Sequence, residues 1–428
     1  MPHEITRRDM MKRAIGTAGL AAGVQLVAVR SPGSARAASS SAAKSSQAPT
    51  SPVAIQRCES FEPQVFRRKL DAALDLIGGI GNLVRDKTVT VKINLTGMSW
   101  DPCCGLPAQE TYITHPATLA ALCAALDDAG ARHIIVIENY YRAEPPEKIL
   151  AAAGWDIAAL QSAGGHKVTF EDVRNRGSWP AYSRFKVPWG GFIYPAFDLN
   201  QRFEKTDVLV SLSKLKQHAC AGVTMTIKNM FGSTPCALYG NQAPNENALV
   251  HRTSMFHSGR KRPPAGVPDE LEHGLPNAAE VRVPQIVADI YGARPVDLTI
   301  VDGVRTLAGG EGSWNRGIRM VEPKVLLAGR NGVCTDAVCT AVMGFDPQAP
   351  DSKPPFPGHN YLNLLASVGV GTNDLGRIEV RGLSLKEAIH PFDPARAASA
   401  DSAIHPTGGL MRCGMRSECS RTAAGDRA

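Results

Sequence analysis

Short runs of β-branched and apolar residues alternate along this chain with segments whose apolar residues recur at helical spacing. Residues 88–94 (TVTVKIN) and 133–138 (HIIVIE) are runs of the first kind, and residues 116–129, which begin with Pro116, have the helical spacing. A strand, a helix and a second strand in this order predict a βαβ unit. The same patterns predict further strands at 167–171, 207–213, 296–302, 324–328 and 377–380, and helices at 283–291, 333–343 and 360–368.

Antiparallel pairing is also expected. Residues 182–187 and 191–197 flank Pro188-Trp189-Gly190, which is typical of a hairpin. We therefore expect an α/β fold with a mixed, largely parallel central sheet, flanking helices and long irregular loops. The longest irregular stretch, 233–279, is expected to be either a lid or disordered.

The N-terminus has the features of an export signal. Residues 6–12 (TRRDMMK) resemble a twin-arginine signal, followed by a weakly apolar stretch at 14–29 and by Ala35-Arg36-Ala37. We expect cleavage after Ala37, the twin-arginine translocase as a partner during export, and a periplasmic or otherwise exported mature protein. The apolar stretch is too short for a stable membrane span, which needs about 20 residues. A basic disordered tail is the alternative interpretation.

Composition indicates the bounds of the remaining segments and argues against nucleic acid as a partner. Six of the 47 Lys/Arg and two of the 40 Asp/Glu lie in the first 37 residues, so the rest of the chain has a net charge of +3. No Lys/Arg-rich run with interleaved aromatic residues is present, so nucleic acid is not expected as a partner. We expect a signal peptide at 1–37, a flexible Ser/Ala-rich linker at 38–57, an α/β domain at 58–392 and a disordered tail at 393–428.

A basic motif follows one of the predicted strands directly. Residues 214–232 read KLKQHACAGVTMTIKNMFG, with three lysines and one histidine and no carboxylate. In an open α/β sheet, the ligand crevice lies at the carboxyl ends of the strands. Because uncompensated ammonium groups repel one another, the motif predicts a positive site that binds an anionic small molecule or cofactor. Surface lysines with salt-bridge partners elsewhere are the alternative.

This motif resembles that of the domain of unknown function 362 family, a pattern Lys-x-Lys-x-His followed by Thr-x-x-x-Lys-Asn-x-x-Gly. The matching residues are Lys214, Lys216, His218, Thr224, Lys228, Asn229 and Gly232. The resemblance extends to residues 91–94, 298–303 with 309–312, and 335–338 with 343–344. Many members carry a C-x-x-C-x-x-C-x-x-x-C-P run for a ferredoxin-type iron–sulfur cluster, and this chain has no such run.

Residues at the ends of the predicted strands are the site candidates. Because parallel neighbouring strands end at the same edge of a sheet, we expect the ends of 207–213 and 296–302 to meet in one concave site. His218 is the proposed proton-transfer group, because it titrates near neutrality, and nearby ammonium groups would lower its pKa. Asp302, at another strand end, is a candidate catalytic acid, metal ligand or lysine partner, or else an aspartate that caps its own loop. The expected ligand-binding residues are Lys214, Lys216, Lys228, Asn229 and Asn94.

Metal ligands are a separate question. Asp302 and Asp336 are acidic candidates, although Asp336 lies early in a predicted helix, where interaction with the helix dipole would explain it. Cys103 and Cys104 form a vicinal pair beside Pro102 and Gly105, and are either a redox or metal pair or incidental thiols. No cysteine spacing matches a zinc finger. The identity of a cofactor is not predicted by the sequence, and a metal ion is one possibility.

Two functions fit these features. The first is an exported enzyme with a basic crevice for an anionic small molecule or cofactor, with metal-linked or oxidoreductase chemistry as one form. The second is a non-catalytic periplasmic anion-binding or scaffold protein. A titratable acid within hydrogen-bond reach of His218 would favour the enzyme, and lysines alone would favour binding.

Overall fold

The computed structural model describes residues 47–175, 181–247, 249–272 and 276–393. The expected signal peptide at 1–37 and all but the first residue of the expected tail at 393–428 lie outside the described residues.

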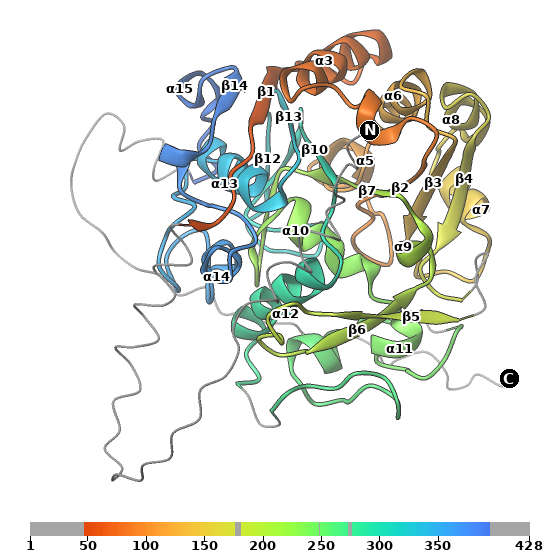
Figure 1. Ribbon diagram of the computed structural model, residues 1–428, viewed down its shortest axis with the longest axis vertical. Helices are drawn as coiled ribbons and strands as arrows, with labels where there is room; N and C mark the ends of the chain where they lie inside the picture. The colour runs from red at the N-terminus through yellow and green to blue at the C-terminus, as the bar shows by residue number, and fades with distance from the viewer. Residues whose placement is uncertain (1–46, 176–180, 248, 273–275, 394–428) are drawn as a thin grey trace, which may run out of the picture. The chain divides into compact units, whose positions relative to one another are not determined.

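An eight-stranded sheet forms the centre of the fold (Figure 1), with strand order β14-β1-β13-β10-β7-β2-β3-β4. Five neighbouring strands, from β10 to β4, are parallel, and β13 is antiparallel to both β10 and β1. The predicted α/β class with a mixed, largely parallel sheet is confirmed. The strands are β1 (Val53–Arg57), β2 (Thr88–Lys92), β3 (His133–Glu138), β4 (Val168–Asp172), β7 (Val208–Lys214), β10 (Leu298–Gly303), β13 (Val325–Gly329) and β14 (Val380–Gly382).

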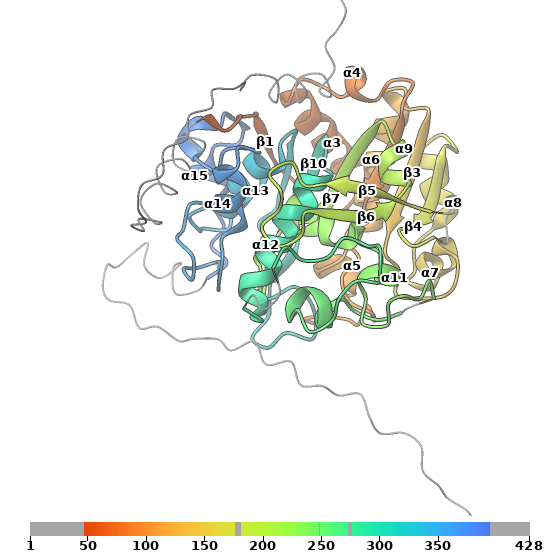
Figure 2. The same cartoon turned by 60° about the horizontal axis from the view of Figure 1, so that its bottom comes forward.

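Helices cover both faces of this sheet, as Figure 2 also shows. One face packs against α3 (Pro63–Leu76), α6 (Pro116–Asp128) and α8 (Ile157–Ala163), and the other against α12 (Ala279–Ala293), α13 (Gly332–Val342) and α14 (Tyr361–Ser367). Successive side chains of a strand point to opposite faces of the sheet. In β7, Leu209 therefore packs with α12, α13 and α14, whereas Val208 and Val210 pack with α3, α6 and α8. Both faces are therefore buried, which explains the nearly continuous apolar strands.

Side chains at the helix starts fix where these helices begin. His115 accepts a hydrogen bond from the amide of Ala117 at the start of α6, where Pro116 is the first residue. Asn331 accepts from the amides of Val333 and Cys334 at the start of α13. Shorter helices are α4 (Gly81–Val84), α5 (Ala108–Thr111), α7 (Pro146–Ala152), α9 (Arg202–Lys205), α10 (Thr226–Asn229), α11 (Cys236–Tyr239) and α15 (Leu385–Ala388).

Small two-stranded sheets and single helical turns complete the fold. The paired strands are β5 (Tyr182–Lys186) with β6 (Ala196–Asn200), β8 (Lys216–His218) with β9 (Gly222–Thr224), and β11 (Thr306–Ala308) with β12 (Arg319–Val321). The helical turns are η1 (Met230–Ser233), η2 (Thr253–His257) and η3 (Leu375–Arg377). Among the described residues, no helix has both the length and the apolar character needed to cross a membrane.

Two expectations need correction. The linker expected at 38–57 is wrong for residues 53–57, because they form β1, which pairs with β13 and β14 inside the central sheet. The expected hairpin exists as β5 and β6, with its second strand at 196–200 and not at 191–197. It is a separate sheet and does not make the central sheet mixed. The reversed strand β13 does, because the chain returns from β10 through the short strands β11 and β12 without a crossover helix.

Candidate functional site

The basic motif occupies a hairpin and a short helix that follow β7. Beyond Lys214 the chain forms the β8–β9 hairpin, and it then returns to pack α10 against β7. Asp336 of α13 anchors this return by accepting hydrogen bonds from the amides of Thr226 and Ile227, both at 2.9 Å. Burial raises the pKa of Asp336 to about 7, although both amides oppose the shift. Asp336 therefore has a structural role: it binds the first backbone amides of α10.

Lys214 and Asp302 form a buried ion pair. They lie opposite each other in β7 and β10, and Lys214 Nζ is 3.0 Å from Asp302 Oδ2. Lys214 also donates to the carbonyl of Arg305, while Asp302 accepts from the hydroxyl of Thr118 and the amide of Val304. Burial lowers the pKa of Lys214, and Asp302 counteracts this shift. The sequence prediction that these strand ends meet is confirmed, and the two charges compensate each other.

Lys216 joins three loops without a carboxylate partner. Its side chain is fully buried, and its Nζ donates to Asn94 Oδ1 at 3.1 Å, to the carbonyl of Glu311 at 3.2 Å and to the carbonyl of Tyr112. Burial lowers the pKa of Lys216 well below its usual value. Since an ammonium has three protons, these contacts occupy all of its donors.

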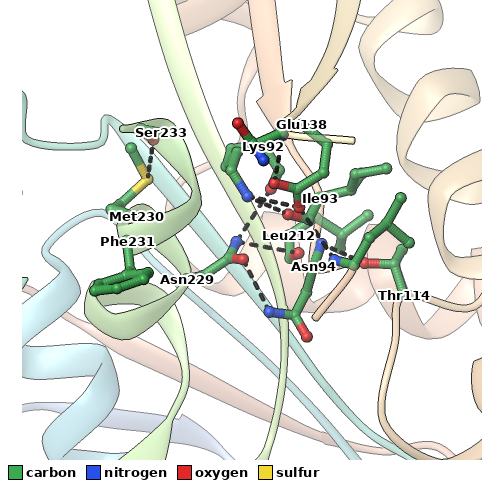
Figure 3. A network of polar contacts seen from close by, with 12 residues as sticks. Lys92, Ile93, Asn94, Thr114, Glu138, Leu212, Asn229, Met230, Phe231 and Ser233 are labelled. Carbon is green, nitrogen blue, oxygen red and sulfur yellow. Dashed lines mark hydrogen bonds and ion pairs between the residues drawn. The ribbon is translucent and has the colours of Figure 1, made fainter. Parts of the chain in front are cut away.

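Asn94 and Asn229 belong to a buried network around a second ion pair (Figure 3). Asn229 accepts from Asn94 Nδ2 at 3.0 Å and donates to Ser211 Oγ at 2.9 Å. Lys92 Nζ lies 2.7 Å from Glu138 Oε2, and burial lowers the pKa of Lys92 and raises that of Glu138. Asn94 and Asn229 are therefore engaged with the protein itself, and they hold α10 against the sheet.

Glu311 is the acid next to His218. His218 Nδ1 lies 3.7 Å from Glu311 Oε2, and no ion pair joins His218 to Asp302, although both belong to the described residues. Glu311 accepts from the amide of Ala219 and from the indole of Trp314. Burial raises the pKa of Glu311, but His218, these donors and Lys228 outweigh it and bring the value to about 2. Asp302 is held by Lys214, as its interpretation as a lysine partner predicts, and the acid nearest to His218 is Glu311 instead.

The tautomer of His218 follows from its hydrogen bonds. Its Nδ1 accepts from the amides of Cys220 at 3.3 Å and Ala221 at 3.4 Å, so the proton of the neutral ring is on Nε2. Burial is the main reason that the pKa of His218 falls to about 3, and Lys228 adds to the shift. The side chain is 9% exposed. His218 thus presents an N–H donor, and no described residue accepts from its Nε2.

Lys228 and Arg252 contact the same aromatic ring. Lys228 Nζ is 4.2 Å and Arg252 Cζ is 5.3 Å from the centroid of Phe231. Lys228 is partly exposed and, among the described residues, has neither a hydrogen-bond acceptor nor an ion-pair partner. Arg252 is 3% exposed and donates to Thr234 and Tyr141, yet its Nη2 is buried with no partner in the described part of the chain. We call Lys228, Arg252 and His218 the unpaired donor cluster.

The other metal candidates do not gather into a site. Cys103 Sγ and Cys104 Sγ are 3.9 Å apart, with Cys103 buried and Cys104 exposed. Within the described ranges, no group of three or more His, Cys, Asp or Glu side chains is arranged to hold a metal ion. Two surface cavities, one lined by residues that include Thr88 and His133 and the other by residues that include Ser258 and Arg260, contain no motif lysine.

Sequence reasoning missed several of these residues. Lys92 and Glu138 could have been noticed as charged residues at the ends of apolar strands, and Glu311 as the lone acid in a glycine-rich turn. Arg252 gave no signal, because it lies in the irregular stretch 233–279. The described part of that stretch contains η2, whose Met255 and Phe256 are buried in the core and place Arg252 beside Phe231.

The fold and the motif define an α/β protein with basic residues beyond the carboxyl end of a central parallel strand. The family model described as domain of unknown function (DUF362) matches residues 89–341. The chain belongs to this family.

Two similar proteins extend the comparison. The thylakoid-associated protein sll1697 of Synechocystis sp. is 26% identical over 190 residues, which are 43% of this chain and 50% of that protein. The match therefore spans half of the relative's length. A solved structure of a protein from Thermotoga maritima aligns with a TM-score of 0.31 and 11% identity, covering 61% of this chain and 55% of that one.

Proposed function

We propose that this protein binds an anionic small molecule through the unpaired donor cluster. One observation carries the proposal: three nitrogen donors of His218, Lys228 and Arg252, namely Nε2, Nζ and Nη2, have no acceptor among the described residues. A buried guanidinium nitrogen without an acceptor costs free energy, about 1–3 kcal/mol or more for a charged group. An acceptor-rich anion would satisfy all three groups.

Glu311 limits how much negative charge such a ligand adds. Its carboxylate lies near His218 and interacts electrostatically with Lys228, but it is already bonded to Ala219 and Trp314. Two cations facing one partly engaged acid leave an excess of positive charge. A carboxylate or an inorganic oxyanion is attracted by this excess.

The arrangement of His218 favours binding over proton transfer by this residue. A general base needs a free lone pair directed at the substrate, and the lone pair of Nδ1 is directed at two backbone amides. The remaining Nε2–H is suited to donate to an anion, as a neutral imidazole does in some isomerases. The proton-transfer role predicted for His218 thus gives way to a donor role in this proposal.

Sulfate titration tests the anion site. Isothermal titration of sulfate into the wild type should show binding that Lys228→Met weakens about tenfold or more, the loss of one charge-assisted hydrogen bond. Lys386→Met, which removes an exposed lysine of α15, is the matched control and should bind as the wild type does. Equal weakening by both variants would mean general electrostatic attraction and would reject the site.

We also propose that the protein is exported by the twin-arginine route. Arg7 and Arg8, the apolar stretch at 14–29 and the small residues before position 38 support this proposal. Replacing both arginines by lysine should retain the protein in the cytoplasm of an expressing bacterium, as measured by cell fractionation. The control Arg13→Lys should leave export intact; unchanged export of the double variant would contradict the proposal.

A further inference from the structure

Four lysines lie near the carboxyl end of strands β2 and β7, and only one of them is available for chemistry. Lys92 and Lys214 are paired with Glu138 and Asp302, and the three protons of Lys216 are donated to oxygen atoms of the protein. All three are at most 1% exposed. Lys228 is partly exposed and has no acceptor among the described residues.

The surroundings of Lys228 favour the unprotonated amine. Burial is the largest cause, and Arg252 and Lys92 add positive charge, while Cys220 and Glu311 act in the opposite direction. The net result is a pKa of about 8, below the usual 10.5. A lysine becomes a nucleophile in this way when it is desolvated beside another cation.

We propose that Lys228 forms an imine with the carbonyl group of a short oxo acid whose carboxylate is bound by Arg252. This inference rests on the proposed anion site and names its substrate class. The lone pair of Lys228 Nζ adds to the carbonyl carbon to give a carbinolamine. Both protons of the amine pass to the former carbonyl oxygen, which leaves as water as the carbon–nitrogen double bond forms, and the imine results.

The geometry supplies each requirement of this step. Arg252 Nη2 offers a buried donor for the carboxylate, and it lies beside the same Phe231 ring as Lys228. His218 interacts electrostatically with Lys228, and its Nε2–H is a third donor of the cluster. Phe231 packs against Phe256, so the side of Lys228 that faces this ring is apolar. Lys228 and Arg252 lie beside the same Phe231 ring, so a substrate whose carboxylate is on the carbon next to its carbonyl could contact both.

Borohydride trapping tests the proposal directly. The wild type is incubated with pyruvate as the probe, reduced with sodium borohydride, and analysed by intact mass and peptide mapping. We expect one reduced adduct per chain, located on Lys228 and absent from Lys228→Arg, which keeps the positive charge. Arg252→Gln should lower the trapping rate about tenfold, the loss of one charge-assisted hydrogen bond.

The outcomes separate this inference from the anion site. Adduct on Lys228 at a rate that increases between pH 7 and 9 supports the imine. Pyruvate or sulfate binding to the wild type without an adduct on Lys228 overturns the imine and leaves the anion site standing. Labelling spread equally over exposed lysines such as Lys386, and unchanged in Lys228→Arg, also overturns it.

Discussion

The lysines near the carboxyl ends of β2 and β7 fall into two groups that differ in their partners. Lys92 and Lys214 each face a buried carboxylate at hydrogen-bond distance, whereas Lys228 shares the ring of Phe231 with a second cation. All three belong to stretches that resemble the same family pattern. The comparison teaches that a lysine motif does not by itself mark ligand contacts. Carboxylates engage Lys92 and Lys214, and amide and carbonyl oxygens engage Lys216, so the acceptors within reach decide which lysines support the fold.

Breaking a paired lysine should give the largest effect on stability. Lys214→Met leaves Asp302 buried without its counter-charge, and Lys92→Met does the same to Glu138. We expect the free energy of unfolding to fall by about 3–5 kcal/mol for each variant, as measured by chemical denaturation. The double variant Lys214→Met/Asp302→Asn should recover part of the loss. A loss below about 1 kcal/mol would mean that the pair is not buried as described.

A substitution at Gly232 tests how tightly the motif packs on the Lys92–Glu138 pair. A methyl group at this position would lie 2.7 Å from both Glu138 Oε1 and Lys92 Nζ. Gly232→Ala should therefore lower the free energy of unfolding by about 1–3 kcal/mol, the usual cost of overpacking. The control Gly81→Ala, where the nearest atom is Arg85 Nη2 at 3.8 Å, should be neutral or slightly stabilising.

Removing the unpaired lysine should change stability in a pH-dependent way. The pKa of Lys228 in the folded protein is about 8, against 10.5 ordinarily, so between these values the unfolded state binds more protons. The free energy of unfolding of the wild type, measured relative to Lys228→Met, should therefore rise with pH from about 8 to 10.5. The slope is at most about 1.4 kcal/mol per pH unit. A difference that is constant across this window would contradict the depressed pKa.

Much of the fold could be predicted from local patterns. The strands at 133–138 and 207–213 and the helix at 116–129 correspond to β3, β7 and α6, because apolar periodicity and Pro116 are local signals. Strand β1 was missed, since its five residues follow a Ser/Ala-rich segment and its partners β13 and β14 are distant in sequence. The helix α3 was also missed.

The candidate site was predictable only in part. The meeting of Lys214 with Asp302 followed from parallel neighbouring strands, whose carboxyl ends share one edge. That Lys216 uses all its donors on loops, and that Glu311 takes the position beside His218, depends on loop conformations that no periodicity encodes. Arg252 reaches Phe231 through the packing of η2, a long-range contact with no local signature.

A crystal structure with selenate would test the central claim most directly. Selenate is an oxyanion whose anomalous scattering locates it without assumptions about the protein. We predict one ordered selenate within hydrogen-bond distance of Lys228 Nζ and Arg252 Nη2, with His218 Nε2 as the third donor, and none at Lys214 or Lys216. Selenate bound at Lys214 after displacement of Asp302, or only at exposed lysines such as Lys386, would contradict the division between paired and unpaired cations.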